Sequence, residues 1–228
     1  MYHLFFEQSG TFKKALEKKG FSALDYDIEN RFHETDIVID LFAEIKRAFF
    51  YESSIFDIIT PGDTIIAFFP CVRFESQFCL IASCNASQYK DLKPLEKLKM
   101  NTESMESLNY FITILNMFVS VCIRKKIPLI IENPYGKPGL LRQYWPFKPQ
   151  VVIADRRKYG DKFPKPTAFW FFNCEPNDNP LFEPLCEVKE GGKAISETAY
   201  GIERSVIAPE FADWFLSSFV LQKEVSHE

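Results

Sequence analysis

Residues 2–27 of the chain, YHLFFEQSGTFKKALEKKGFSALDYD, contain the pattern that decides the fold. The apolar run at residues 2–6 is typical of a buried strand, and residues 12–19 repeat apolar side chains at helical spacing. Gly20 stands where a helix C-cap is expected, and residues 21–27 are a second strand-like run that finishes on acidic residues. A helix is the usual connection between parallel neighbours, so this stretch predicts the first unit of a parallel sheet.

The rest of the chain continues this alternation of strands and helices. Further strands are expected at residues 64–69, 129–131, 151–154 and 168–172, and helices at residues 36–50, 105–124 and 209–220. Residues 72–99 have no clear periodicity, which predicts a long, partly mobile loop, and Thr102 is a candidate cap for the helix that follows. The fold class is therefore predicted to be α/β, with a doubly wound, mostly parallel, Rossmann-like sheet.

The length and composition indicate one globular core. A chain of 228 residues, 46% hydrophobic and 25% charged, is long enough for one domain and at most a small appendage. We expect a main domain over residues 1–175 and a C-terminal extension over residues 176–228, whose closing helix packs on the same domain. The longest apolar run, residues 108–123, is shorter than a membrane span, and the N-terminus lacks a basic leader, so a cytoplasmic protein is expected.

The cysteines do not suggest a metal site. The six cysteines include no C-x-x-C pair and have no histidine nearby, so we expect no metal ion and no disulfide bond. The ordinary role of such a cysteine is that of a small buried hydrophobe. A functional role for any of them therefore needs support from its position in the chain.

The charge is unevenly distributed. The formal net charge of −4 gives no sign of a nucleic-acid partner. Within residues 137–165, however, eight basic residues stand against two acidic ones, namely Lys137, Arg142, Lys148, Arg156, Arg157, Lys158, Lys162 and Lys165. Aromatic side chains in the same stretch add stacking surfaces, so it predicts contacts with phosphates and bases, with a solvated loop face as the plain alternative.

In a doubly wound sheet, ligands bind at the carboxyl ends of the strands, so the residues there are the ones to inspect. Gly10, in the turn after the first strand, allows a cofactor to approach the backbone and the N–H groups of the next helix. Asp27 closes the second strand and can accept hydrogen bonds from a ribose, with Asp25 as the alternative if the register differs by two residues. A tight turn and a surface carboxylate explain the same residues without a ligand.

Two further strand ends carry reactive groups. The tripeptide F-P-C at residues 69–71 ends an apolar strand, and a proline directly after a buried strand stops its hydrogen-bond ladder. We therefore expect Cys71 at the site and not in the core. Glu132 and Asn133 follow the strand predicted at residues 129–131. Taken alone, the Glu-Asn pair is equally well explained by capping of a strand end.

Taken in order, these features resemble the cytosine carbon-5 DNA methyltransferases, and more closely their short relatives in phages and mobile elements. In that family an F-x-G-x-G turn binds the cofactor, and FEQSGTF at residues 6–12 stands in its place. An F-P-C or P-P-C turn supplies the nucleophile, matched by Cys71, and an E-N motif supplies an acid for the cytosine ring, matched by Glu132. The K-P-T-x-x-W string of the short relatives runs from Lys165 to Trp170, and the resemblance covers about residues 2–173.

The resemblance implies transfer of a methyl group from S-adenosylmethionine to cytosine in DNA, through a covalent adduct between Cys71 and carbon-6 of the base. Glu132 is then the acid for the ring nitrogen, and Arg156 or Arg157 favours the thiolate or holds the base carbonyl. The implied cofactor-binding residues are Phe6, Gln8, Ser9, Gly10, Thr11, Asp27, Asp40, Phe69 and Pro70. A base turned out of its duplex is expected to meet aromatic side chains, for which the candidates are Tyr135, Tyr144 and Trp145.

The chain departs from the family pattern at several positions. Gln8 replaces the first glycine of the cofactor turn, Val72 replaces the glutamine that commonly follows the cysteine, and residues 155–157, D-R-R, match a paired-arginine motif only loosely. These departures favour a second hypothesis, in which a degenerate, inactive methyltransferase fold binds nucleic acid for a mobile element. Methylation of an amine is a third possibility, but there the strand-end motif usually finishes on an aromatic residue, where this chain has Cys71.

Overall fold

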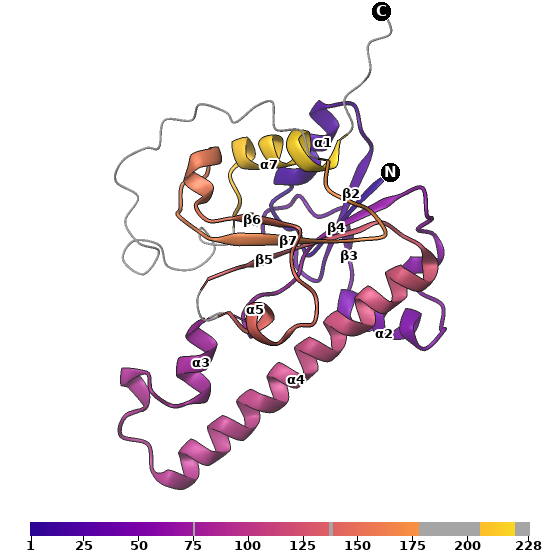
Figure 1. Ribbon diagram of the computed structural model, residues 1–228. Helices are drawn as coiled ribbons and strands as arrows, with labels where there is room; N and C mark the ends of the chain where they lie inside the picture. Colours follow the sequence, from indigo (N-terminus) through magenta and orange to yellow (C-terminus); the bar gives the residue numbers. More distant parts are fainter. Residues whose placement is uncertain (75, 137–138, 178–205, 222–228) are drawn as a thin grey trace, which may run out of the picture.

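The computed structural model describes residues 1–74, 76–136, 139–177 and 206–221. Its centre is a seven-stranded sheet in the order β3-β2-β1-β4-β5-β7-β6 (Figure 1). The strands are β1 (Tyr2–Phe5), β2 (Ala23–Asp27), β3 (Ile37–Val38), β4 (Thr64–Phe68), β5 (Leu129–Pro134), β6 (Val151–Ile153) and β7 (Thr167–Phe172). Lys137, Cys186 and most of the predicted C-terminal extension lie outside the described residues.

The directions of the strands confirm the coarser part of the fold prediction, an α/β fold with a mostly parallel sheet. Strands β1 to β5 run parallel, whereas β7 is antiparallel to both of its neighbours, β5 and β6. In the sheet register Phe5 pairs with Ala67 and Phe68 pairs with Glu132, so the carboxyl ends of β1, β4 and β5 meet at one edge. The protein is therefore an α/β fold with a mostly parallel sheet, compatible with a Rossmann-like arrangement.

Helices cover both faces of the sheet (Figure 1). Helices α1 (Thr11–Lys18) and α7 (Pro209–Phe215) contact each other on one face, and α7 continues into the π-helical turn η5 (Leu216–Val220). The other face carries α2 (Leu41–Phe49), α4 (Pro94–Lys125) and α5 (Leu140–Tyr144). The remaining helical segments are η1 (Ile55–Asp57), α3 (Ser76–Ala82), η2 (Ser87–Tyr89) and η3 (Arg156–Tyr159).

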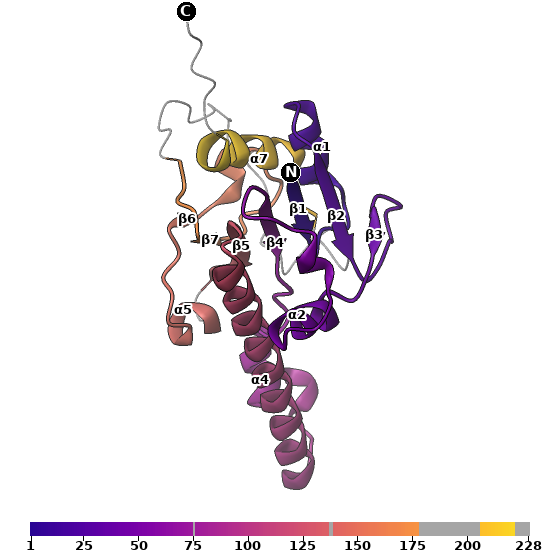
Figure 2. The ribbon, with the colours of Figure 1, turned by 90° about the vertical axis from the view of Figure 1, so that its right-hand side faces the viewer.

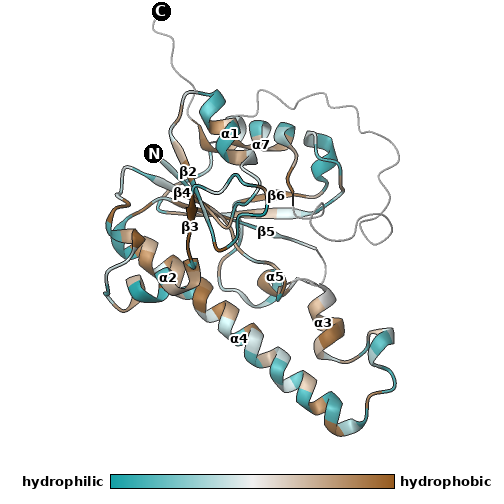
Figure 3. Ribbon diagram, turned by 180° about the vertical axis from the view of Figure 1, so that it is seen from behind, coloured by the Kyte–Doolittle hydropathy of each residue, from teal (hydrophilic) through white to brown (hydrophobic). Residues whose placement is uncertain are grey.

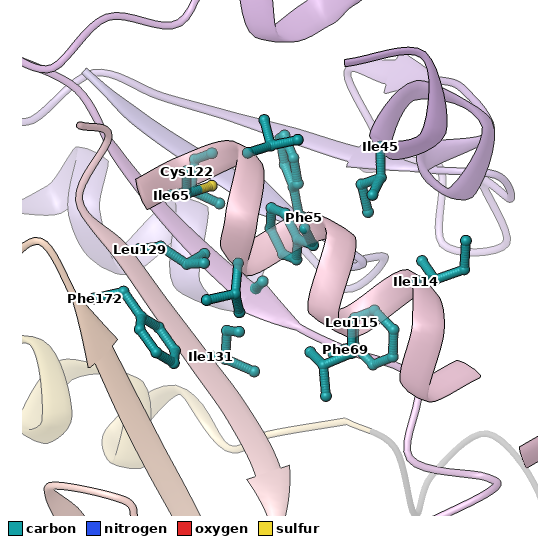
Figure 4. Packing of buried hydrophobic residues seen from close by; sticks show 14 of the residues in the cluster. Phe5, Ile45, Ile65, Phe69, Ile114, Leu115, Cys122, Leu129, Ile131 and Phe172 are labelled. Atoms are coloured by element: carbon teal, nitrogen blue, oxygen red, sulfur yellow. The ribbon is translucent and has the colours of Figure 1, made fainter. Parts of the chain in front are cut away.

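Two apolar cores lie on opposite faces of the sheet because successive strand residues point in opposite directions. In β4, Ile65 packs in the core beneath α2 and α4, whereas Ile66 packs in the core beneath α1 and α7. Figure 4 shows the first of these cores, in which Phe5, Leu115 and Ile131 fill the space between α4 and the sheet. Strands covered on both faces explain the continuous apolar runs in the sequence.

The predicted loop over residues 72–99 is wrong. This segment contains α3, η2 and the start of α4, and Figure 2 shows α4 projecting well beyond the sheet. Thr102 is inside α4 and caps nothing; the helix begins at Pro94, where the backbone N–H of Lys93 donates to Glu96 at 2.7 Å. The first half of α4 packs on α3 and not on the sheet, so its sequence lacks the continuous apolar stripe that would have indicated a helix.

Helix α4 is also longer and more apolar than the sequence analysis expected. By length and composition alone it could cross a membrane, with a mean hydropathy of 1.4 over its most apolar window. The buried residues of its second half, among them Ile114, Phe118 and Cys122, pack in the core beneath α2. Figure 3 shows the apolar colouring of α4 where it runs beside α2, and 33% of its most apolar window is buried inside the protein.

Replacing Phe118 by alanine should lower the free energy of unfolding by about 3–5 kcal/mol, because its ring is fully buried and stacks on Phe5 at 5.7 Å. The measurement is the midpoint of urea unfolding at unchanged slope. Ile123→Ala is the matched control on the same helix, since Ile123 is 46% exposed; it should change the free energy by about 0.5 kcal/mol or less. Equal losses in both variants would contradict the assigned core.

Candidate functional site

A cavity of about 450 Å³ lies at the carboxyl edge of the sheet, where the ends of β1, β2, β4 and β5 meet. This volume is in the range of sites for small molecules and cofactors. The cavity brings together nine of the residues expected at the site: Phe6, Gln8, Ser9, Asp27, Phe69, Pro70, Cys71, Glu132 and Arg156. Residues far apart in the sequence therefore share one enclosure because the parallel register aligns their strand ends.

The turn between β1 and α1 is capped by Glu7. Its Oε1 atom accepts the backbone N–H groups of Thr11 at 2.6 Å and Phe12 at 3.3 Å, and the hydroxyl of Ser9 at 2.8 Å. The other carboxylate oxygen, Oε2, is buried and has no hydrogen-bond partner within the described part of the chain. Burial raises the pKa of Glu7 despite these hydrogen bonds. A carboxyl side chain of the protein thus already occupies the N-terminus of α1, where anionic ligands commonly bind.

Gly10 and Thr11 shape the turn but do not line the cavity. Gly10 has φ of +64°, and a Cβ atom there would lie 3.2 Å from the side chain of Glu34, so glycine is needed for both conformation and space. Phe6 does line the cavity and has φ of 61°, a strained value for a residue with a side chain. Its ring packs edge-on against Phe42 and Phe69, which fixes an aromatic wall.

Asp27 is the carboxylate of β2 that faces the cavity. It is 5% exposed, and its Oδ1 atom accepts the side-chain amide of Gln8 at 3.0 Å and the backbone N–H of Glu29 at 2.9 Å. Burial raises the pKa of Asp27. Asp25, the alternative considered from the sequence, does not line the cavity, because it is fully buried beside Lys13.

The catalytic pair expected from the sequence lies on the opposite wall. Cys71 is part-exposed and Glu132 is buried, and both line the same cavity. The Thr167 hydroxyl donates to Glu132 Oε1, which fixes the carboxylate from the neighbouring strand β7. Asn133 donates its side-chain amide to the backbone carbonyl of Phe69 at 2.8 Å, so it ties the end of β5 to the turn that carries Cys71.

The two arginines differ from their expected roles. Arg156 lines the cavity, but its guanidinium is buried in an ion pair with Asp161, where Nε donates to Oδ2 at 2.6 Å. Arg157 is paired with Asp155 at 2.7 Å and does not line the cavity. Both cations are therefore already paired with carboxylates of their own segment, which reduces their influence on a thiol. Asp40 is also away from the cavity, since it caps α2 by accepting two backbone N–H groups.

The aromatic residues proposed to meet a flipped base do not line the cavity. Trp145 is a core residue, 7% exposed, and its indole N–H donates to Asn116 at 2.9 Å. Tyr144 is 71% exposed on the surface, and Tyr135 packs edge-on against Trp170 beneath Arg142. The sequence pattern showed aromatic residues in a basic stretch but carried no information on the direction of their side chains.

Several lining residues were missed by the sequence analysis as site residues. The acidic and aromatic wall includes Glu7, Phe12, Phe32 and Phe68; Arg31 and Lys165 add positive charge; Val206 and Ile207 come from the segment before α7. Glu7 and Phe12 both lie within the quoted turn motif FEQSGTF, but neither was assigned to the cofactor. No sequence pattern predicts that residues 206–207 line the cavity, because their position depends on how α7 packs on the sheet.

A buried charge cluster holds the loop that carries Arg31 and Phe32 to the cavity. The ammonium of Lys13 lies 3.1 Å from Asp36, 3.3 Å from Asp25 and 2.6 Å from the backbone carbonyl of Glu34. The two aspartates also bind each other's backbone N–H groups, at 2.7 and 3.1 Å. The cluster joins α1, β2 and the start of β3, so the loop between the two strands is fixed at both ends.

Lys13→Ala should destabilise the protein by about 3 kcal/mol at pH 7, because it leaves the buried Asp25 carboxylate without its cation. Burial raises the pKa of Asp25. An acid with a raised folded pKa destabilises the fold above its unfolded pKa, so the penalty should be larger at pH 7 than at pH 4. Urea unfolding at both pH values measures this difference.

Lys14→Ala is the matched control, because Lys14 makes an exposed ion pair with Glu34. We expect a loss of less than about 1 kcal/mol at either pH. A penalty for Lys13→Ala that is the same at pH 4 and pH 7 would contradict the assigned role of the ammonium.

Within the described residues there is no cluster of histidine, cysteine and carboxylate side chains that could hold a metal ion. Neither the family models nor the curated proteins contain a match to this sequence.

Proposed function

We propose that the protein transfers a methyl group from S-adenosylmethionine to cytosine in DNA, through a covalent adduct with Cys71. The observation that carries the proposal is the single cavity lined by Cys71, Glu132 and Asp27 together with the turn after β1. A thiol, an acid and a possible ribose acceptor are the groups that this reaction requires in one enclosure.

The sheet supports a Rossmann-like methyltransferase fold. Strands β3, β2, β1, β4 and β5 follow the doubly wound order, with the cavity at their carboxyl edge. The antiparallel β7 between β5 and β6 is a departure from an all-parallel sheet.

The polar groups of the first turn favour a cofactor without phosphate groups. Dinucleotide cofactors place their pyrophosphate at the N-terminus of the first helix. In this protein the Glu7 side chain accepts the N–H groups of Thr11 and Phe12, so a pyrophosphate would find these two donors already taken by a carboxyl group. The second oxygen of Glu7 is buried without a partner in the described residues, and as an acceptor it offers nothing to a phosphate. S-adenosylmethionine carries a ribose and no phosphate.

The residues of the opposite wall fit the expected chemistry. S-adenosylmethionine supplies, when bound, an electrophilic methyl group. Cys71 adds as a thiolate to carbon-6 of cytosine, and Glu132 protonates or hydrogen-bonds the ring nitrogen, so that carbon-5 becomes nucleophilic. Transfer of the methyl group would leave S-adenosylhomocysteine, and loss of the carbon-5 proton to a water molecule would then restore the double bond and release the thiolate. Thr167 and Asn133 act as positioning residues, since they hold Glu132 and the turn of Cys71.

The positive charges of residues 142–165 are compatible with a nucleic-acid substrate. Lys165 lines the cavity, and Lys158 and Lys162 are exposed in the same segment of chain. Arg142 and Lys148 are also exposed. Such side chains can contact phosphates while a base enters the cavity.

A second function is favoured by one contact. The hydrogen bond from Gln8 to Asp27 occupies the expected ribose acceptor with a side chain of the protein itself. A degenerate methyltransferase fold that binds nucleic acid without catalysis would tolerate such a contact. Binding of the cofactor separates this alternative from the enzyme.

The first test is thermal unfolding with S-adenosylmethionine. A ligand at about 100 times its dissociation constant stabilises a protein by about 2.7 kcal/mol, so the melting temperature should rise by several degrees. NAD at the same concentration should cause no rise, because Glu7 opposes its pyrophosphate. A rise with NAD and none with S-adenosylmethionine would refute the proposed cofactor.

The second test concerns the nucleophile. Cys71→Ala should abolish methyl transfer to DNA and leave the melting shift with S-adenosylmethionine unchanged, measured by incorporation of labelled methyl groups. Glu132→Gln should lower the rate at least about a hundredfold, the usual contribution of acid catalysis. Cys79→Ala is the matched control, because Cys79 is also part-exposed but does not line the cavity. Full methyltransferase activity of Cys71→Ala would refute the adduct mechanism.

A further inference from the structure

The contact between Gln8 and Asp27 joins the ends of two neighbouring strands across the cavity wall. Gln8 follows β1, Asp27 ends β2, and both side chains line the cavity. The amide nitrogen of Gln8 donates to Asp27 Oδ1 at 3.0 Å, and the backbone N–H of Glu29 donates to the same oxygen at 2.9 Å. One oxygen of the carboxylate is therefore satisfied by the protein before any ligand arrives.

This contact has an energetic reason. Asp27 is 5% exposed, and a buried carboxylate is costly unless hydrogen-bond donors surround it. Gln8 supplies such a donor, and its hydrogen bond favours the charged form of Asp27, against the effect of burial. A ribose offers a second way to satisfy the same group, because its two adjacent hydroxyls can donate to the two oxygens of one carboxylate. The amide and the ribose thus compete for Asp27 Oδ1.

We propose that Gln8 determines how strongly the cavity binds a ribose diol, by competing with one of its two hydroxyls for the Asp27 carboxylate. The proposal rests on the proposed function, in which Asp27 is the acceptor for the ribose of the cofactor. While the amide stays in place, a bound nucleoside donates a single hydroxyl to Asp27. The cavity consequently binds nucleosides weakly and distinguishes poorly between ribose and 2′-deoxyribose.

Removal of the amide should restore binding through both hydroxyls. Adenosine and 2′-deoxyadenosine are the probes, and their dissociation constants are measured by calorimetry for the wild type and for Gln8→Ala. We expect Gln8→Ala to bind adenosine about tenfold more tightly, the effect of one hydrogen bond to a charged group. Its affinity for 2′-deoxyadenosine should change less than about twofold, because this probe keeps only one of the two hydroxyls of the diol.

Two further variants separate the hydrogen bond from other effects. Gln8→Met keeps the approximate volume of the side chain but removes the amide donor, so it should also tighten adenosine binding. Gln8→Ala combined with Asp27→Asn should lose the gain, because an uncharged amide replaces the shared acceptor. Unfolding midpoints measured for each variant identify any change of the fold itself.

The outcomes distinguish this proposal from the proposed function. Tighter adenosine binding in both Gln8 variants, with little change for 2′-deoxyadenosine, supports the competition. If the wild type binds adenosine and Gln8→Ala binds it equally or more weakly, the proposed competition is overturned and the cofactor assignment stays intact. A gain in Gln8→Ala but not in Gln8→Met also overturns it, because bulk and not the amide would then limit binding. If neither adenosine nor S-adenosylmethionine binds any variant at millimolar concentration, both proposals fail together.

Discussion

The burial of strands β1, β4 and β5 between two apolar cores is the constraint on which the rest of the structure depends. Their side chains alternate between the core beneath α2 and α4 and the core beneath α1 and α7, so a shift of one residue in register would exchange the two sets. The register is therefore fixed, and with it the position of the strand ends. Polar residues that follow the last buried position of each strand have no place in either core. They meet at the carboxyl edge, where the cavity lies.

Within this edge the charges are divided between two walls. Glu7 and Asp27 make the wall of β1 and β2 acidic, and each already accepts hydrogen bonds from its own segment. On the wall of β4 and β5, Glu132 is held by Thr167, while Asn133 ties β5 to the turn of Cys71. A ligand that binds the first wall must exchange one set of hydrogen bonds for another. The net affinity consequently depends on how well the protein satisfies its own carboxylates without the ligand.

The sequence predictions succeeded where a local pattern had a single structural meaning. The strand ending at F-P-C was placed within one residue, because a continuous apolar run followed by proline leaves few alternatives. The prediction failed for residues 72–99, where α3 and the first half of α4 pack mainly on each other and need no stripe facing the sheet. Arg156 lines the cavity as expected, but its buried ion pair with Asp161, five residues later, was not indicated by any local pattern.

The amino-acid sequence by itself determined the order of the principal strands and of most helices, the mostly parallel sheet, and the set of strand ends at which a site could form. These properties follow from periodicity and chain connection, which are local. Only the tertiary structure decided which strand-end residues face the cavity, since Gln8 and Asp27 do while Gly10, Asp40 and Arg157 do not. Side-chain direction depends on capping, ion pairing and packing between segments distant in the sequence. For that reason the Glu7 cap and the Gln8–Asp27 contact became visible only in three dimensions.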